Sequence, residues 1–146
     1  MACSPNESEG LVVSGGIPVD DSCVSAFQEL KSRRDINTVI YRLSDNLETV
    51  IPDAKGNLTH DELLKVLPAD EPRYVVHDLL FATADGTRQE KIVLISWCPP
   101  GTNAEERIAH FSGYSTLRNL LDGVQVHVQA TDLSDMEYKA LVSQAC

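Results

Sequence analysis

The spacing of apolar residues predicts four helices along this chain. The first spans about 21–34, where apolar residues recur three and four positions apart after a capping aspartate. A short second helix follows the capping box at 59–62. A long third helix follows the prolines and glycine at 99–101 and ends near residue 121. A second capping box, at 134–137, predicts the terminal helix.

Runs of β-branched and apolar residues predict two hairpins between these helices. The first pairs strands at 36–43 and 47–51, and residues 52–57 are expected to form a loop. The second joins 73–83 to 89–98 through an Asp-Gly turn. Its apolar runs are nearly continuous, which is typical of central strands covered on both faces.

The last strand alternates strictly between apolar and polar residues over 124–130, so its apolar residues from Val124 to Ala130 are expected on one buried face. The order helix, two strands, helix, two strands, helix, strand, helix predicts an α/β (α+β) fold, a mixed sheet with helices on both faces. A length of 146 residues favours one domain with one core, placed at 16–146. Residues 1–15 are polar and end in glycine, as in a flexible tail.

An excess of acidic residues narrows the range of partners. The 22 acidic and 12 basic residues give a formal net charge of −10. That charge repels nucleic-acid phosphates and anionic lipid headgroups, so neither is the expected partner. No run approaches the ~20 apolar residues of a membrane span, and the first ten residues lack the pattern of a secretory signal. We therefore expect a cytoplasmic protein.

Residues that carry chemistry do not gather into a recognisable motif. The four cysteines form no Cys-x-x-Cys pair and the four histidines are scattered, so neither type predicts a metal site. No nucleophile elbow or P-loop is present. A cysteine and a histidine distant in sequence remain open as a nucleophile pair, but the sequence favours a binding role over catalysis.

Four separated blocks carry a resemblance to a known family. They are SGGIPVDDSCVSAFQELK (14–31), LPADEPRYVVHDLLFATADG (67–86), KIVLISWCPP (91–100) and LRNLLDGVQVHVQATDLSDMEY (117–138). In order and spacing they resemble the actin-depolymerising factor/cofilin family, nearest to its plant and algal members. The resemblance runs from about residue 14 to the C-terminus. It implies a single ADF-homology domain, with a mixed sheet of about five strands between helices.

The resemblance implies an actin-binding function, with neither enzymatic activity nor a cofactor. Family members bind actin monomers and filaments, favour the ADP form, and promote depolymerisation and severing of filaments. Actin is therefore the expected partner of a monomeric, cytoskeletal protein. Inhibition by phosphoinositides is common in the family, and the acidic charge of this chain gives it weak support.

A first actin contact is implied just before the first helix. In the family a regulatory serine directly precedes a glycine at this place, whereas here Gly15 occupies the serine position and Ser14 lies one residue earlier. Phosphorylation of Ser14 would add a charge of about −1.5 to −2 and oppose docking. The alternative is that Ser14 is a turn residue without a regulatory role. The implied contact residues are Gly16, Ile17, Pro18 and Val19.

A second contact is implied on the long helix, where the charge differs from the family pattern. The family typically has Arg-Ser-Lys at its start, and Glu105, Glu106 and Arg107 stand there instead, so the first base has become an acid. A later lysine of the family is also absent, since residues 112–115 read Ser-Gly-Tyr-Ser. We expect Glu105 to weaken the encounter with acidic actin. The implied contact residues are Arg107, Ile108, Tyr114 and Arg118.

The apolar residues of this helix have a second interpretation. Ile108, Phe111, Tyr114, Leu117 and Leu121 recur three and four positions apart, as in a helix face that packs on a core. We expect core positions for Leu117 and Leu121. Ile108 and Tyr114 stay open between core and contact.

A third contact, needed mainly for filaments, is implied by Arg88 and Lys91 near the second hairpin. On the last helix Ser143 and Gln144 stand where the family often has charged residues. The filament contact therefore has fewer charges, and we expect monomer binding to survive better than severing. The alternative is a divergent relative with a shifted partner, such as the filament-branching complex that the glia-maturation-factor branch binds.

Overall fold

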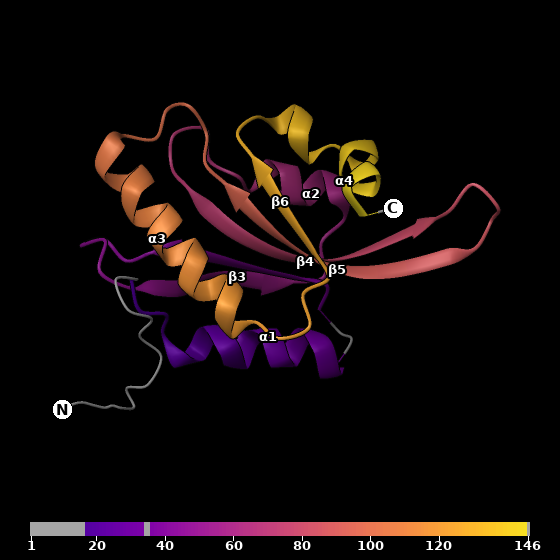
Figure 1. Cartoon of the computed structure of the whole chain (residues 1–146), viewed down its shortest axis with the longest axis horizontal. Helices are drawn as coiled ribbons and strands as arrows, with labels where there is room; N and C mark the ends of the chain where they lie inside the picture. The colour runs from indigo at the N-terminus through magenta and orange to yellow at the C-terminus, as the bar shows by residue number, and fades with distance from the viewer. Residues whose placement is uncertain (1–16, 34–35, 146) are drawn as a thin grey trace.

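Five strands form one mixed sheet at the centre of the molecule, in the order β3-β2-β4-β5-β6 (Figure 1). The computed structural model describes residues 17–33 and 36–145. The strands are β2 (Thr38–Leu43), β3 (Val50–Gly56), β4 (Arg73–Ala82), β5 (Arg88–Trp97) and β6 (Val126–Ala130). Neighbouring strands are antiparallel except β5 and β6, which are parallel. The predicted mixed sheet is confirmed.

Helices cover both faces of this sheet, as the sequence predicts. The elements are α1 (Asp21–Arg33), α2 (His60–Lys65), α3 (Ala104–Leu120), the 3-10 helix η1 (Leu133–Met136) and α4 (Tyr138–Ala145). Helices α1 and α3 cover one face, where Phe27 and Leu117 share a core with Tyr41. Helices α2 and α4 cover the other, where Leu141 shares a core with Ile40. The sheet therefore divides the expected single core into two.

Local capping signals in the sequence are borne out at the first two helices. The Asp20 carboxylate accepts a hydrogen bond from the Ser22 amide at 3.1 Å, at the start of α1. At α2 the Thr59 hydroxyl accepts from the Glu62 amide at 3.1 Å, and the Glu62 carboxylate accepts from the Thr59 amide at 2.8 Å. These bonds satisfy amides that a helix start leaves without partners.

Strand β3 corrects the prediction that 52–57 is a loop. Pairing with β2 continues through Pro52 to Gly56, with a bulge: Tyr41 pairs with Pro52 and Ile40 with Ala54, so Asp53 is the extra residue. Proline is tolerated because β3 is an edge strand, where one side of the backbone needs no ladder partner.

The segment before β6 corrects a second prediction. Strand β6 begins at Val126, and Val128 and Ala130 are buried in the core under α2 and α4. Val124 packs instead against the core under α1 and α3. The predicted strand at 124–130 therefore begins two residues too early. The chain enters β6 from a turn at Gly123, where φ is 112°, so residues 124 and 125 precede the strand.

The predicted capping box at 134–137 is also wrong. Asp132 accepts from the Ser134 amide at 3.1 Å and so caps η1, and Asp135 accepts from the Thr131 amide at 3.0 Å. Glu137 is extended, with φ −61° and ψ 148°, and separates η1 from α4. Asp132 therefore caps η1 in place of Ser134, whose amide donates to the Asp132 carboxylate.

Candidate functional site

The segment before α1 and the first half of α3 lie side by side. The Ile17 amide donates to the Ser112 hydroxyl at 3.2 Å, across 95 residues of sequence. The Val50 amide donates to the Pro18 carbonyl at 3.0 Å, which ties this segment to the edge of β3. The structure therefore brings together two contacts that the sequence placed far apart. Gly16, Gly15 and Ser14 lie outside the described residues.

Helix α3 presents an exposed apolar side chain beside this segment. Asn103 caps the helix by accepting from the Glu106 amide at 2.8 Å. Ile108 is 73% exposed and Phe111 is 41% exposed, whereas Leu117 and Leu121 lie in the core as expected. Ile108 and Phe111 are three positions apart on the helix, so they form a small exposed apolar patch, which marks a candidate contact.

Two implied contact residues are buried. Val19 is 2% exposed and Tyr114 is 6% exposed, and both belong to the core under α1 and α3. Burial also raises the pKa of the Tyr114 hydroxyl. Both side chains therefore lie beneath the surface in this structure, and a contact of these two residues with a partner stays a prediction. Helical period alone could not separate Tyr114 from Ile108, because both fall on one broad stripe.

A histidine that the sequence did not single out anchors α3 to the sheet. His110 is fully buried, and its Nε2 lies 2.8 Å from the Ser96 hydroxyl. Burial lowers the pKa of His110 to about 4, so the ring is neutral near pH 7. Its position three residues before Gly113 is the available signal, since a small residue one turn away permits close packing on the strands.

An acid-rimmed groove of about 440 Å³ separates α3 from the β2–β3 turn. We call it the Ile17–Ile108 groove, because Ile17, Leu47 and Ile108 provide its apolar walls, with Asp45 and Glu105 at the rim. Leu47 has φ of 61°, a left-handed conformation that costs a leucine about 1–2 kcal/mol. The groove can accept an apolar side chain, and its acids favour a basic neighbour on the partner.

The two bases of the long helix lie at its opposite ends. Arg107 donates through Nη2 to the Thr102 carbonyl at 3.1 Å, so its guanidinium lies at the start of α3. Arg118 is exposed in the last turn. The face between them carries Ile108 and Phe111.

The two bases implied for filaments are not brought together. Arg88 pairs with Ala82 and Lys91 pairs with Leu79, so both lie on β5 of the second hairpin. They are three positions apart, an odd number, and side chains of a strand alternate between its two faces, so Arg88 and Lys91 point to opposite faces. Lys91 lies on the same face as Val93, which belongs to the core under α4, and Arg88 lies on the face of α1.

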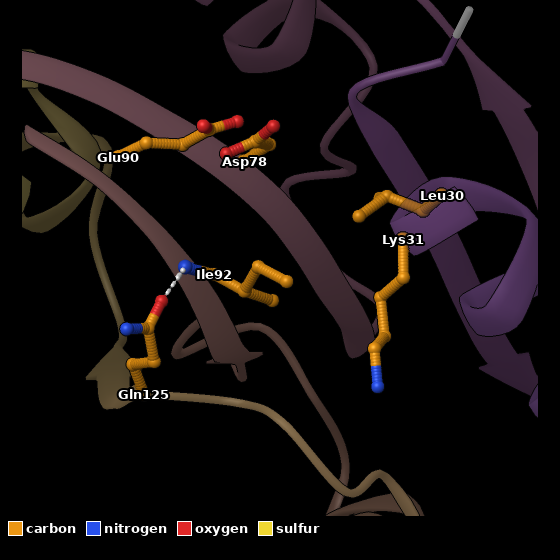
Figure 2. Close-up of a pocket in the computed structure, with 6 residues that line it drawn as sticks. All are labelled: Leu30, Lys31, Asp78, Glu90, Ile92 and Gln125. Atoms are coloured by element: carbon orange, nitrogen blue, oxygen red, sulfur yellow. Dashed lines mark hydrogen bonds between the residues drawn. The ribbon is translucent and has the colours of Figure 1, made fainter. Parts of the chain in front are cut away.

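A separate pocket of about 220 Å³ lies between α1 and the strands β4 and β5 (Figure 2). The Gln125 side chain accepts from the Ile92 amide at 3.0 Å at one wall, and Figure 2 shows the carboxylates of Asp78 and Glu90 together at another. None of the implied contact residues lines this pocket. It is distinct from the Ile17–Ile108 groove.

The described residues contain neither a metal-binding cluster nor a membrane-spanning helix. Within 17–33 and 36–145, no group of three or more histidine, cysteine, aspartate or glutamate residues is placed to hold a metal ion. No helix in that part of the chain is long and apolar enough to cross a membrane.

Solved structures define the class of protein to which this fold belongs. The crystal structure of Streptomyces griseoflavus cofilin superposes with a TM-score of 0.82 at 27% identity, over 89% of this chain and 97% of that one. The structure of Plasmodium berghei actin depolymerization factor 2 superposes with a TM-score of 0.80 at 21% identity, over 89% and 96%. The fold is that of the cofilins.

Sequence comparison identifies the family. The model for cofilin/tropomyosin-type actin-binding proteins matches residues 16–146. Actin-depolymerizing factor 1 of Arabidopsis thaliana is 33% identical over 134 residues, 90% of this chain and 96% of that protein. Cofilin-1A of Dictyostelium discoideum is 35% identical over 127 residues, 86% and 92%. The chain belongs to this actin-depolymerising factor/cofilin family, whose members bind actin and are not enzymes.

Proposed function

We propose that this protein binds actin monomers and filaments and promotes filament depolymerisation. The observation that carries the proposal is Ile108, which is 73% exposed on a capped helix beside the segment that begins at Ile17. The relatives named actin-depolymerizing factor and cofilin support it. A few side chains that become fully buried carry most of the binding energy at an interface, and Ile108 is placed to be one of them.

The side chains that make the contact are those the structure exposes. In this proposal Ile108 docks into actin, with Arg107 and Arg118 at either end of the helix and Ile17 and Pro18 at its side. Val19 and Tyr114 hold that surface in place from the core. Gly16 continues the contact outside the described residues.

Regulation and nucleotide preference form a further part of the proposal. The family resemblance supports a monomeric protein that favours ADP-actin and binds phosphoinositides weakly. Depolymerisation follows if the protein binds one filament conformation better than another, since a ligand shifts an equilibrium by its differential affinity. Ser14 is proposed as a phosphorylation site, and an unchanged actin affinity of Ser14→Glu, compared with Ser8→Glu, would contradict it.

We propose that the protein severs filaments less effectively than a typical family member, while its binding to actin monomers is better preserved. Arg88 and Lys91 point to opposite faces of their strand, so they do not form one basic patch. Ser143 and Gln144 are exposed on α4 and carry no charge. With fewer charges to engage a second actin subunit, the protein is expected to associate with filaments more slowly, because charges at the rim of an interface chiefly set the association rate.

A second candidate function is binding to the filament-branching complex. Glu105 at the rim of the Ile17–Ile108 groove favours it, because an acid there suits a partner more basic than actin. Under this candidate the protein removes branches and leaves monomers and filaments unaffected.

Two assays on the whole protein separate these candidates. Co-sedimentation with filaments measures filament binding, and release of labelled nucleotide from actin monomers measures monomer binding. Slowed nucleotide release together with co-sedimentation is the result expected for an actin-depolymerising protein. Loss of filament branches without either effect would contradict it and favour the second candidate.

A further inference from the structure

The first residue of α4 is hydrogen-bonded to a strand of the second hairpin. The Tyr138 hydroxyl donates to the Leu80 carbonyl at 2.6 Å, across 58 residues of sequence. Tyr138 is 44% exposed, so this bond lies at the surface of the molecule. A tyrosine held in this way joins the last helix to β4.

Leu80 lies on β4 just beyond the residues that pair with β2. Pairing of β2 with β4 extends over Tyr74–His77, and the Asp78 amide then donates to the Asn37 carbonyl at 2.8 Å. Backbone groups of alternate strand residues point to the same side, so the Leu80 carbonyl points to the side of β4 on which β2 lies. Within the described residues, the Tyr138 bond is the next one along that side.

Beyond Leu80 the hairpin extends away from the helices (Figure 1). It continues to the turn at Gly86, where φ is 88°, and returns along β5 from Arg88. Two strands alone are marginally stable in water, so the orientation of this part depends on how its base is held.

Tyr138 also contacts the second helix on the same face. Its ring meets the ring of His60 edge to face, with centroids 5.9 Å apart and planes at 87°. His60 is the first residue of α2. One side chain thus lies where α4, α2 and β4 meet, and it contacts elements that carry no implied actin-monomer residue.

We propose that Tyr138 is a positioning residue for filament binding. By holding the base of the second hairpin against α4, it sets the orientation of Arg88 and Lys91 relative to the last helix. The inference rests on the proposed actin function and adds the residue that couples the two filament-binding elements. Monomer binding, which uses α3 and the segment before α1, does not depend on this bond.

Replacement of Tyr138 by phenylalanine tests the proposal. Tyr138→Phe keeps the ring and removes the hydroxyl, and we expect filament affinity in co-sedimentation to fall about three- to tenfold, the range expected for one neutral hydrogen bond. Monomer affinity, from nucleotide release, should stay within about twofold. Equal losses for filaments and monomers, or no loss for either, would overturn the proposal.

Tyr41→Phe is the matched control. It also removes one hydroxyl that donates to a carbonyl, that of Cys23 at 2.9 Å, but in the core under α1. It should lower the melting temperature and leave the ratio of filament to monomer affinity unchanged. A changed ratio in Tyr41→Phe as well would assign the effect to general destabilisation and refute the positioning role.

Hydrogen exchange, measured without actin, tests whether the hydrogen bond from Tyr138 to Leu80 holds the base of the second hairpin. Amides of residues 81–88 should exchange about three- to tenfold faster in Tyr138→Phe, while those of β2 and β3 keep their rates. Unchanged exchange rates at 81–88 would refute the positioning role of Tyr138, even if the protein binds actin as proposed. A wild-type protein that binds neither monomers nor filaments would refute the proposed function, and the inference with it.

Discussion

The Tyr74 hydroxyl donates to the His110 carbonyl at 2.7 Å, and the two rings stack with centroids 4.4 Å apart. Tyr74 lies on β4 and His110 on α3, so this pair joins the centre of the sheet to the candidate actin-binding helix. Ile108, two residues earlier, points outward because His110 points inward. The exposed contact and the buried anchor are therefore two consequences of one helix orientation.

Gly113 permits this close packing, and its replacement should destabilise the protein. A Cβ atom there would lie 2.5 Å from the Tyr74 hydroxyl and 2.8 Å from Val50 Cγ2. Glycine to alanine in a helix ordinarily adds up to about 1 kcal/mol of stability. We expect Gly113→Ala instead to lower the free energy of unfolding in urea by about 1–3 kcal/mol. Ser115→Ala, on the exposed side of the same helix, should change it by less than about 0.5 kcal/mol.

Two buried histidines should make the protein sensitive to acid. Burial lowers the pKa of His110 to about 4. The pKa of His77 is also lowered to about 4, mainly by burial and to a smaller extent by the nearby His60. In the unfolded chain both have a pKa near 6.5, so below that pH the unfolded state binds more protons. Stability is therefore complete above about pH 6.5 and is lost as the pH falls towards 4.

Urea unfolding at several pH values measures this dependence. Each histidine should contribute on the order of 3 kcal/mol to the loss, because one pKa unit corresponds to about 1.4 kcal/mol. In His110→Gln the free energy of unfolding should fall less between pH 7 and pH 4 than it does in the wild type. A variant as acid-sensitive as the wild type would show that His110 is not one of the groups responsible.

Reversing the charge of Glu105 should tighten binding to actin. Glu105 lies at the rim of the Ile17–Ile108 groove, where the family typically has a base. For Glu105→Arg we expect an association rate about two- to tenfold higher at low salt, with a smaller gain at high salt because ions screen exposed charges. Stopped-flow binding to labelled monomers measures it.

Asp61→Arg makes the same change of charge on α2, on the other face of the sheet, and should have little effect. If Glu105→Arg weakens binding or does nothing, α3 engages its partner differently from the rest of the family.

Truncation of Ile108 should weaken actin binding without affecting the fold. Because its side chain is 73% exposed, Ile108→Ala removes little buried area and should leave the melting temperature unchanged. Affinity for actin monomers should fall about tenfold, as for an interface anchor. Val66→Ala removes an exposed aliphatic side chain next to α2 and serves as the control. Equal affinities of Ile108→Ala and the wild type would remove Ile108 from the contact.

Signals within a few residues predicted much of the fold. The α1 and α2 caps, the Asp-Gly turn and the two apolar central strands were predicted correctly, because each depends on neighbours in the sequence. The family resemblance supplied the candidate contacts. The predicted strand began at residue 89, so only the structure placed Arg88 and Lys91 on one strand and therefore on opposite faces.

The tertiary structure decided what depends on distant partners. It accommodated Pro52 in a strand because β3 is at the edge of the sheet, and it separated Val124 from the rest of its alternating run. It also buried Val19 and Tyr114 while exposing Ile108, since the packing of His110 on Tyr74 determines which side of α3 faces the sheet. Helical period identifies a stripe of apolar residues, but only the contacts of the helix with the sheet divide that stripe into core and surface.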